Sequence, residues 1–74
     1  MKIKEGAAVE TLVDKTDING MDNTVFIPKG TKGLICDVNH VHKGSVLVEF
    51  YAMDIPQEIW GVYEYALLDL KPLG

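Results

Sequence analysis

The chain contains no arginine, a single cysteine and no long apolar run. All seven of its basic residues are lysines, and eleven acidic residues bring the formal net charge to −4. Arginine is the side chain best suited to bidentate phosphate recognition, and nucleic-acid affinity comes largely from neutralising backbone phosphates. The composition therefore argues against binding to DNA or RNA. A local lysine patch is the alternative, but Lys29, Lys32 and Lys43 are spread among turns rather than along one stripe.

The lone cysteine, Cys36, excludes an internal disulfide and is typical of a protein from a reducing compartment. No segment reaches the roughly 18–20 apolar residues that a membrane span requires. Residues 1–6 are followed by no apolar stretch of the kind that a secretion signal contains. We therefore expect a cytoplasmic protein with no membrane partner.

The length of 74 residues suits one domain and leaves no room for a second core, so we expect residues 1–74 to fold as a single unit. A hydrophobic content of 47% is ordinary for a globular domain and too high for a disordered chain. The sequence therefore predicts a small folded domain of modest stability.

Residues of high β propensity alternate along most of the chain, with turn signals between them. The clearest segment places Val46, Val48 and Phe50 on one face, which we expect to face the interior. Residues 14–28 are expected to form a long, irregular hairpin arm, and residues 64–67 suit one 3₁₀ turn. The five expected strands cover residues 6–13, 33–38, 45–51, 58–63 and 68–71.

Five short strands joined by regular turns predict an all-β fold, a small five-stranded barrel. Residues 28–33 have the sequence Pro-Lys-Gly-Thr-Lys-Gly at the start of the second strand, and residues 69–72 are Asp-Leu-Lys-Pro. These motifs, with the strand pattern over residues 6–73, resemble the SH3-like barrel superfold, in particular its small bacterial members.

Relatives of that form include KOW modules of transcription and translation, a peripheral photosystem I subunit, barrel domains of nitrile-hydratase-type subunits, and short bacterial and phage families of unknown role. The resemblance implies docking on a larger partner rather than catalysis. The likeness to signalling SH3 domains is weaker, because Glu64 stands where those domains carry the ligand-binding proline and Leu67 where they carry a tyrosine. We therefore do not expect recognition of proline-rich peptides, which requires an aromatic-lined groove.

No combination of residues predicts a catalytic, cofactor or metal site. His40 and His42 fall short of the three or four ligands that zinc requires, so we expect them to be exposed in a loop. Cys36 alternates with Leu34 and Val38, which predicts a small buried core residue rather than a nucleophile. The two glycines of residues 28–33 lack the motif and the following helix of a phosphate loop and are expected to serve a turn. We expect no enzyme activity.

Aromatic residues concentrate in the third and fourth expected strands and in the turn beyond them. A barrel of this size buries two or three such rings, and any that remain exposed would form a patch of the kind found at interaction hot spots. Burial of all of them in the core is the alternative. We favour the patch, because Met53, Ile55 and Ile59 add apolar surface nearby. The candidate partner-binding residues are Tyr51, Trp60, Tyr63 and Tyr65.

These observations favour a non-enzymatic protein-interaction module, a small subunit or a regulator or inhibitor that docks on a larger protein. Its own state is a monomer or a homodimer. A KOW-like nucleic-acid-binding module is the alternative from another class, based on the lysines around residues 28–33. A barrel domain that serves a metalloenzyme in trans is the third hypothesis.

Overall fold

The structure is a computed structural model that describes residues 3–74. Residues 1 and 2, which belong to the segment considered above for a secretion signal, lie outside the described residues. The described chain contains strands, turns and short 3₁₀ helices, so the all-β prediction is confirmed. None of its helices is long and apolar enough to cross a bilayer.

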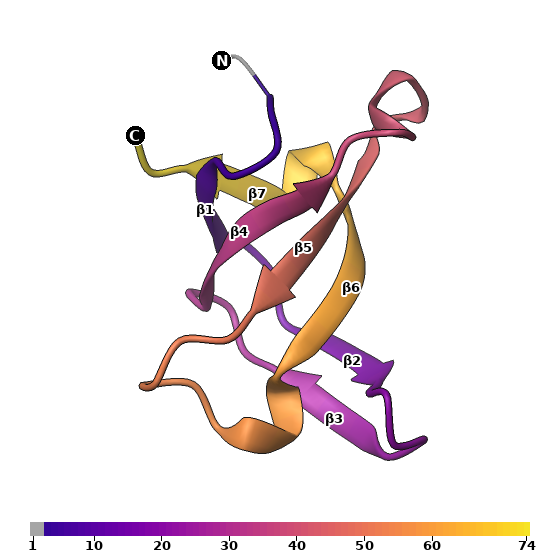
Figure 1. The fold of residues 1–74 in the computed structure, drawn as a ribbon, viewed down its shortest axis with the longest axis vertical. Helices are drawn as coiled ribbons and strands as arrows, with labels where there is room; N and C mark the ends of the chain where they lie inside the picture. The colour runs from indigo at the N-terminus through magenta and orange to yellow at the C-terminus, as the bar shows by residue number, and fades with distance from the viewer. Residues whose placement is uncertain (1–2) are drawn as a thin grey trace.

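The strands form two antiparallel sheets (Figure 1). The larger sheet has five strands in the order β6-β5-β4-β1-β7, and the smaller is the hairpin β2-β3. Within residues 3–74 neither sheet closes on itself, so the arrangement shown is two sheets around one core. The strands are β1 (Ala8–Thr11), β2 (Lys15–Ile18), β3 (Thr24–Ile27), β4 (Lys32–Asp37), β5 (Ser45–Phe50), β6 (Gly61–Ala66) and β7 (Leu70–Pro72).

The segment 14–28 is more regular than predicted, because it folds into the hairpin β2-β3 with continuous pairing. Asn19 explains the tight connection: its side-chain oxygen accepts hydrogen bonds from the backbone N–H groups of Met21 at 2.9 Å and Asn23 at 3.0 Å. Such bonds from an asparagine side chain stabilise a turn locally. The predicted hairpin over residues 14–28 is therefore confirmed, whereas its expected irregularity was wrong.

The fourth strand lies three residues later than predicted. Residues 58–63 were expected, but Gln57–Ile59 forms the 3₁₀ helix η2 and β6 runs from Gly61 to Ala66. The length of β5 decides the difference, since its residues pair one for one with β6 from Phe50↔Gly61 to Ser45↔Ala66. The 3₁₀ turn predicted at residues 64–67 is displaced in the same way and appears as η3, Leu67–Asp69.

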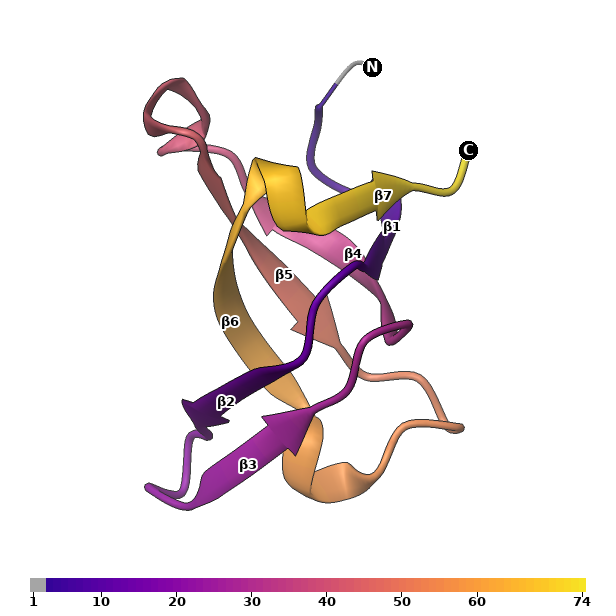
Figure 2. The ribbon, with the colours of Figure 1, turned by 180° about the vertical axis from the view of Figure 1, so that it is seen from behind.

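The core lies between the five-stranded sheet and the hairpin. The predicted inward face of β5 is confirmed, because Val46, Val48 and Phe50 are all buried. In Figure 1, β2 crosses behind β6, and in Figure 2, seen from behind, it crosses in front. The hairpin therefore covers one face of the sheet, and the part of the chain that the structure describes places no second layer on the opposite face. The buried apolar side chains are Val9, Val25, Ile27, Ile35, Val46, Val48, Phe50, Ile55, Ile59, Tyr63, Tyr65 and Leu70.

The β3–β4 turn is held by a polar side chain that the sequence pattern did not identify. Thr11 is buried, its hydroxyl donates to the Pro28 carbonyl at 3.2 Å, and it accepts from the Thr31 N–H at 3.1 Å. Gly30 adopts a φ of 90°, which favours glycine. The motif at residues 28–33 is thus a turn, as predicted, and strand β4 rather than a helix follows it.

Candidate functional site

The face of the five-stranded sheet opposite the hairpin is the candidate site, and we call it the outer face. Cross-strand pairing aligns Ala8 with Leu34, Leu34 with Glu49, and Glu49 with Val62 in one row across the sheet. Directly paired residues point to the same side of a sheet, so these side chains share the outer face. Leu73 extends the row beyond β1, because its N–H donates to the Ala8 carbonyl at 3.0 Å.

A second row of side chains on the same face lies beside the first, two residues away on each strand. Glu10 pairs with Lys71 of β7 on one side and with Lys32 of β4 on the other. Tyr51 directly follows the last residue of β5 and Trp60 directly precedes the first residue of β6, so both continue this row. The outer face therefore combines a row that is apolar except for Glu49 with a row of charged and aromatic side chains.

The outer face contains an apolar groove with a volume of about 370 Å³. Exposed side chains of considerable size line or flank it: Tyr51 is 54% exposed, Leu34 43% and Leu73 40%. Exposed apolar surface that is contiguous, rather than scattered, is typical of interaction sites on small soluble proteins. The residues that line the groove are Ala8, Lys32, Gly33, Leu34, Glu49, Tyr51, Ala52 and Leu73.

Tyr51 is held in place by Trp60. Their rings meet edge to face with centroids 6.3 Å apart. The Trp60 indole N–H donates to the Ile55 carbonyl at 3.0 Å, which ties the ring to the β5–β6 loop. Aromatic pairs in this geometry contribute about 0.5–1.5 kcal/mol beyond their buried area. Of the four predicted partner-binding residues, Tyr51 therefore forms an aromatic wall of the groove, and Trp60 supports its ring without lining the groove.

The other two predicted residues lie in the core. Tyr63 is 4% exposed and Tyr65 is 2% exposed, and both rings pack against Phe50 with centroids 5.9 Å and 6.1 Å away. The prediction that two or three rings are buried is confirmed by Phe50, Tyr63 and Tyr65. Their burial follows from the alternation of β6, in which Tyr63 and Tyr65 occupy the inward positions. Neither ring can therefore belong to an exposed patch, and Tyr51 and Trp60 remain.

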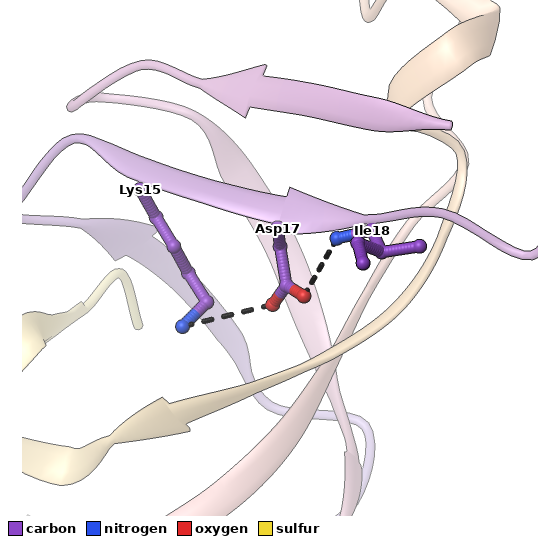
Figure 3. A network of polar contacts seen from close by, with 3 residues as sticks. All are labelled: Lys15, Asp17 and Ile18. Atoms are coloured by element: carbon purple, nitrogen blue, oxygen red, sulfur yellow. Dashed lines mark hydrogen bonds and ion pairs between the residues drawn. The ribbon is translucent and has the colours of Figure 1, made fainter. Parts of the chain in front are cut away.

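The two buried tyrosines lie beneath strand β2. The ammonium group of Lys15 lies 5.1 Å from the centroid of the Tyr65 ring. It also lies 3.7 Å from the Asp17 carboxylate (Figure 3). Burial and the negative charge of Asp17 raise the pKa of Tyr65 to about 12, and the same causes raise the pKa of Tyr63. Among residues 3–74, neither tyrosine hydroxyl has a hydrogen-bond partner. Both hydroxyls therefore stay protonated at neutral pH.

The residues considered for metal or nucleophilic chemistry are separated. His40 and His42 are exposed next to or within the 3₁₀ helix η1, Val41–Lys43, as predicted. The described part of the chain brings no three histidine, cysteine, aspartate or glutamate side chains together in a metal-binding arrangement. Cys36 is only half-buried, so its prediction as a core residue was wrong: the inward position in this part of β4 belongs to Ile35, and Cys36 is the unpaired residue of a bulge between Ile35 and Asp37.

A larger depression, with a volume of about 590 Å³, lies between the hairpin and the β5–β6 loop. Its apolar side chains include Phe26, Ile55 and Ile59, and charges of both signs surround them at Lys32, Asp54 and Glu58. None of the four predicted partner-binding residues lines it. The outer face therefore remains the better candidate.

Comparison of the chain with protein-family models, with curated proteins and with solved structures finds no match.

Proposed function

We propose that this protein is a non-enzymatic interaction module that docks on a larger protein through its outer face. The observation that carries the proposal is the apolar groove on that face, walled by Tyr51 and flanked by Leu34 and Leu73. An aromatic side chain in a groove, with aliphatic neighbours and a polar margin, is the arrangement in which a few residues supply most of the binding energy. The proposal assigns no catalytic residue and no cofactor.

The matching surface on the partner follows from the chemistry of the groove. Its apolar floor accepts one aliphatic or aromatic side chain, while Lys32 and Glu49 at its margins favour a carboxylate and a basic group at the corresponding positions. Because the groove lies on paired strands, little ordering of the backbone accompanies binding, and the affinity is not reduced by that cost.

An SH3-like barrel is the architecture that we propose for this scaffold. The order β6-β5-β4-β1-β7, the hairpin between β1 and β4, and the 3₁₀ helix directly before the last strand support it. In such a barrel the hairpin would complete the wall that the larger sheet leaves open. The fold supports many functions, so the proposed role rests on the groove and not on the architecture.

Photo-crosslinking tests the proposal. A photoreactive phenylalanine analogue at position 34 should capture one protein from an extract of the source cells, and Tyr51→Ala in the same chain should abolish the capture. The analogue at position 18 is the matched control, because Ile18 is also well exposed but lies on the hairpin. Equal capture from both positions, or capture that survives Tyr51→Ala in the folded protein, would contradict docking at the groove.

A nucleic-acid-binding module of the KOW type is the alternative, and Lys32 and Lys71 on the outer face are the observation that favours it. Phosphate contacts make such binding strongly salt-dependent. Binding of RNA or DNA at physiological ionic strength, weakened by Lys32→Gln and by added salt, would support this alternative. Absence of binding at low salt would remove it.

A further inference from the structure

The outermost strands of each sheet have backbone N–H and C=O groups that no neighbouring strand pairs. In the larger sheet these strands are β6 and β7, and in the hairpin both β2 and β3 have one free side. Such edges invite pairing with another chain, and proteins usually protect them with proline, charge, short length or a covering segment. Strands β2, β3 and β7 are protected in these ways, whereas β6 is not.

The protected edges are each blocked by identifiable residues. Strand β7 has three residues and ends at Pro72, which has no N–H group to offer. On β2, the Asp17 carboxylate accepts the Ile18 N–H at 2.7 Å, as Figure 3 shows. Helix η2 packs against β3, and the Asn19 side-chain amide donates to the Glu58 carbonyl at 3.0 Å.

The unpaired groups of β6 can be assigned from its ladder with β5. The Leu67 N–H donates to the Gly44 carbonyl at 2.8 Å, which makes these two residues a hydrogen-bonded pair of the antiparallel ladder. Because hydrogen-bonded and non-hydrogen-bonded pairs alternate, Tyr65 and Tyr63 direct their backbone groups toward β5. The backbone groups of the even-numbered residues, which are Val62, Glu64 and Ala66, therefore point away from the sheet.

Within residues 3–74, we find no segment or side chain that blocks these groups along β6. The strand has six residues, contains neither proline nor lysine, and pairs with β5 without a register shift. In Figures 1 and 2, β6 runs along the rim of the molecule, and beyond the crossing with β2 none of the segments within residues 3–74 lies along its outer side. The carboxylate of Glu64 is held over β5, because the Ser45 hydroxyl donates to it at 3.1 Å. Its side chain therefore leaves the backbone edge accessible.

The charged side chains near this edge indicate which kind of segment can pair with β6. Strands β5 and β6 carry Glu49 and Glu64 and no basic side chain. A second copy of the chain is disfavoured, because a twofold antiparallel pair that uses all three unpaired residues places Glu64 opposite Glu64 of the other copy. Like charges directly opposite each other destabilise a sheet, whereas opposite charges stabilise it.

We infer that β6 accepts an extended segment of a partner protein as a sixth strand, and that this segment carries a basic residue opposite Glu64 and an apolar residue opposite Val62. Addition of a strand supplies main-chain hydrogen bonds for affinity and alternate side chains for specificity. The inference rests on the proposed role as a protein-interaction module and defines the chemistry of the partner at the margin of the outer face.

Residue-resolved amide hydrogen exchange of the full chain tests the inference, with a short capped synthetic peptide of alternating valine and lysine as the probe. The amides of Val62, Glu64 and Ala66 should exchange about tenfold more slowly at a peptide concentration of about ten times the dissociation constant. The amides of Tyr63 and Tyr65 should exchange at an unchanged rate, because they already bond to β5. A peptide of alternating valine and glutamate should give no protection.

Two variants separate strand addition from nonspecific charge attraction. Glu64→Pro removes an N–H that points away from β5, so it should abolish the protection of Val62 and Ala66 while the β5–β6 ladder stays intact. Glu64→Lys keeps the backbone donor and should reverse the preference toward the valine–glutamate peptide. Unchanged exchange at all three edge amides in the unmodified protein, or unchanged peptide preference in Glu64→Lys, would overturn the inference.

The failure of this inference is distinguishable from the failure of the proposed function. If β6 accepts no strand, the valine–lysine peptide protects no edge amide, but the crosslink from position 34 remains. If the outer face does not dock a protein, the crosslink is lost whatever the peptide does.

Discussion

Phe50 occupies the space that a side chain on Gly33 would need. A Cβ atom built on Gly33 would lie 2.7 Å from Cδ1 of the Phe50 ring and 2.7 Å from the Glu49 carbonyl oxygen. Gly33 is on β4 and Phe50 is on the neighbouring strand β5. Because Gly33 has no side chain, the Phe50 ring can pack against β4 at this position. The second glycine of residues 28–33 is therefore needed for packing, while the first is needed for the turn.

Gly33→Ala should lower the free energy of unfolding by about 1–3 kcal/mol, because the added methyl group overpacks the core against a backbone carbonyl and an aromatic ring. Urea denaturation followed by Trp60 fluorescence measures the change. Gly20→Ala is the matched control, since a Cβ atom there meets nothing within 4 Å and its φ is not positive. Equal stability of the two variants would show that Phe50 can move aside without cost.

Thr11→Val should destabilise the protein by about 1 kcal/mol, since it keeps the shape of a buried side chain but removes the hydroxyl that accepts from the Thr31 N–H at 3.1 Å, and that N–H keeps only its longer bond to the Pro28 carbonyl at 3.3 Å. The loss should appear first as faster hydrogen exchange at the β3–β4 turn. Thr16→Val, on an exposed position of β2, should change the stability by less than about 0.5 kcal/mol. A turn that exchanges at the original rate in Thr11→Val would contradict the role assigned to the hydroxyl.

Tyr65→Phe should raise the free energy of unfolding at neutral pH by about 1 kcal/mol, because it removes a buried hydroxyl that has no hydrogen-bond partner within residues 3–74. Thermal unfolding of the variant beside Tyr51→Phe measures this, since the Tyr51 ring is exposed and its hydroxyl should contribute little. A lower melting temperature for Tyr65→Phe than for Tyr51→Phe would mean that the hydroxyl is satisfied in solution.

The same residue should make stability fall at alkaline pH. The pKa of Tyr65 is about 12 in the folded protein against an ordinary value of 10.0, so the folded state binds the proton more tightly than the unfolded state. The Tyr65 proton therefore leaves the stability unchanged below pH 10, and the stability falls as the pH rises from 10 toward 12, because the unfolded state loses this proton before the folded state does. Urea denaturation between pH 9 and pH 12 should show a shallower decline in Tyr65→Phe, and identical slopes would exclude the shifted pKa.

Trp60→Phe should loosen the β5–β6 loop, because phenylalanine keeps an aromatic ring beside Tyr51 but cannot donate to the Ile55 carbonyl. We expect a loss of about 1 kcal/mol in stability and faster exchange of the Ile55 amide, whose own partner is the Ala52 carbonyl in the same loop. The exchange of the β1 and β4 amides should stay unchanged. Equal acceleration throughout the chain would indicate a global rather than a local effect.

The sequence predicted best the segments in which one face is wholly apolar and the other is mixed. Strand β5 is such a segment, since Val46, Val48 and Phe50 alternate with residues that include Ser45 and Glu49, and its inward face was predicted correctly. In residues 58–66, apolar and aromatic side chains occupy both odd-numbered and even-numbered positions. The alternation alone therefore could not locate the start and end of β6. Pairing with β5, which is a contact between segments distant in sequence, decided its position.

The sequence predicted only part of the candidate site, and the missing part has a related explanation. Tyr51 and Trp60 were identified, but Leu34 was assigned to the interior together with Cys36. Strand β4 is apolar on both faces along Leu34, Ile35 and Cys36, and such a run does not indicate which face is buried. Leu73 lay beyond the last expected strand and could be placed on the outer face only through its bond to Ala8.

The affinity of the captured partner for two matched variants tests the central claim most directly. Tyr51→Ala and Ile18→Ala both truncate a side chain that is more than half exposed, one on the outer face and one on the hairpin. Calorimetric titration with the protein isolated through the crosslink at position 34 should give a dissociation constant at least about thirtyfold higher for Tyr51→Ala. The constant for Ile18→Ala should stay within about twofold of the original, as expected for a residue outside the interface. Equal affinities for Tyr51→Ala and the unmodified protein would contradict docking at the outer face.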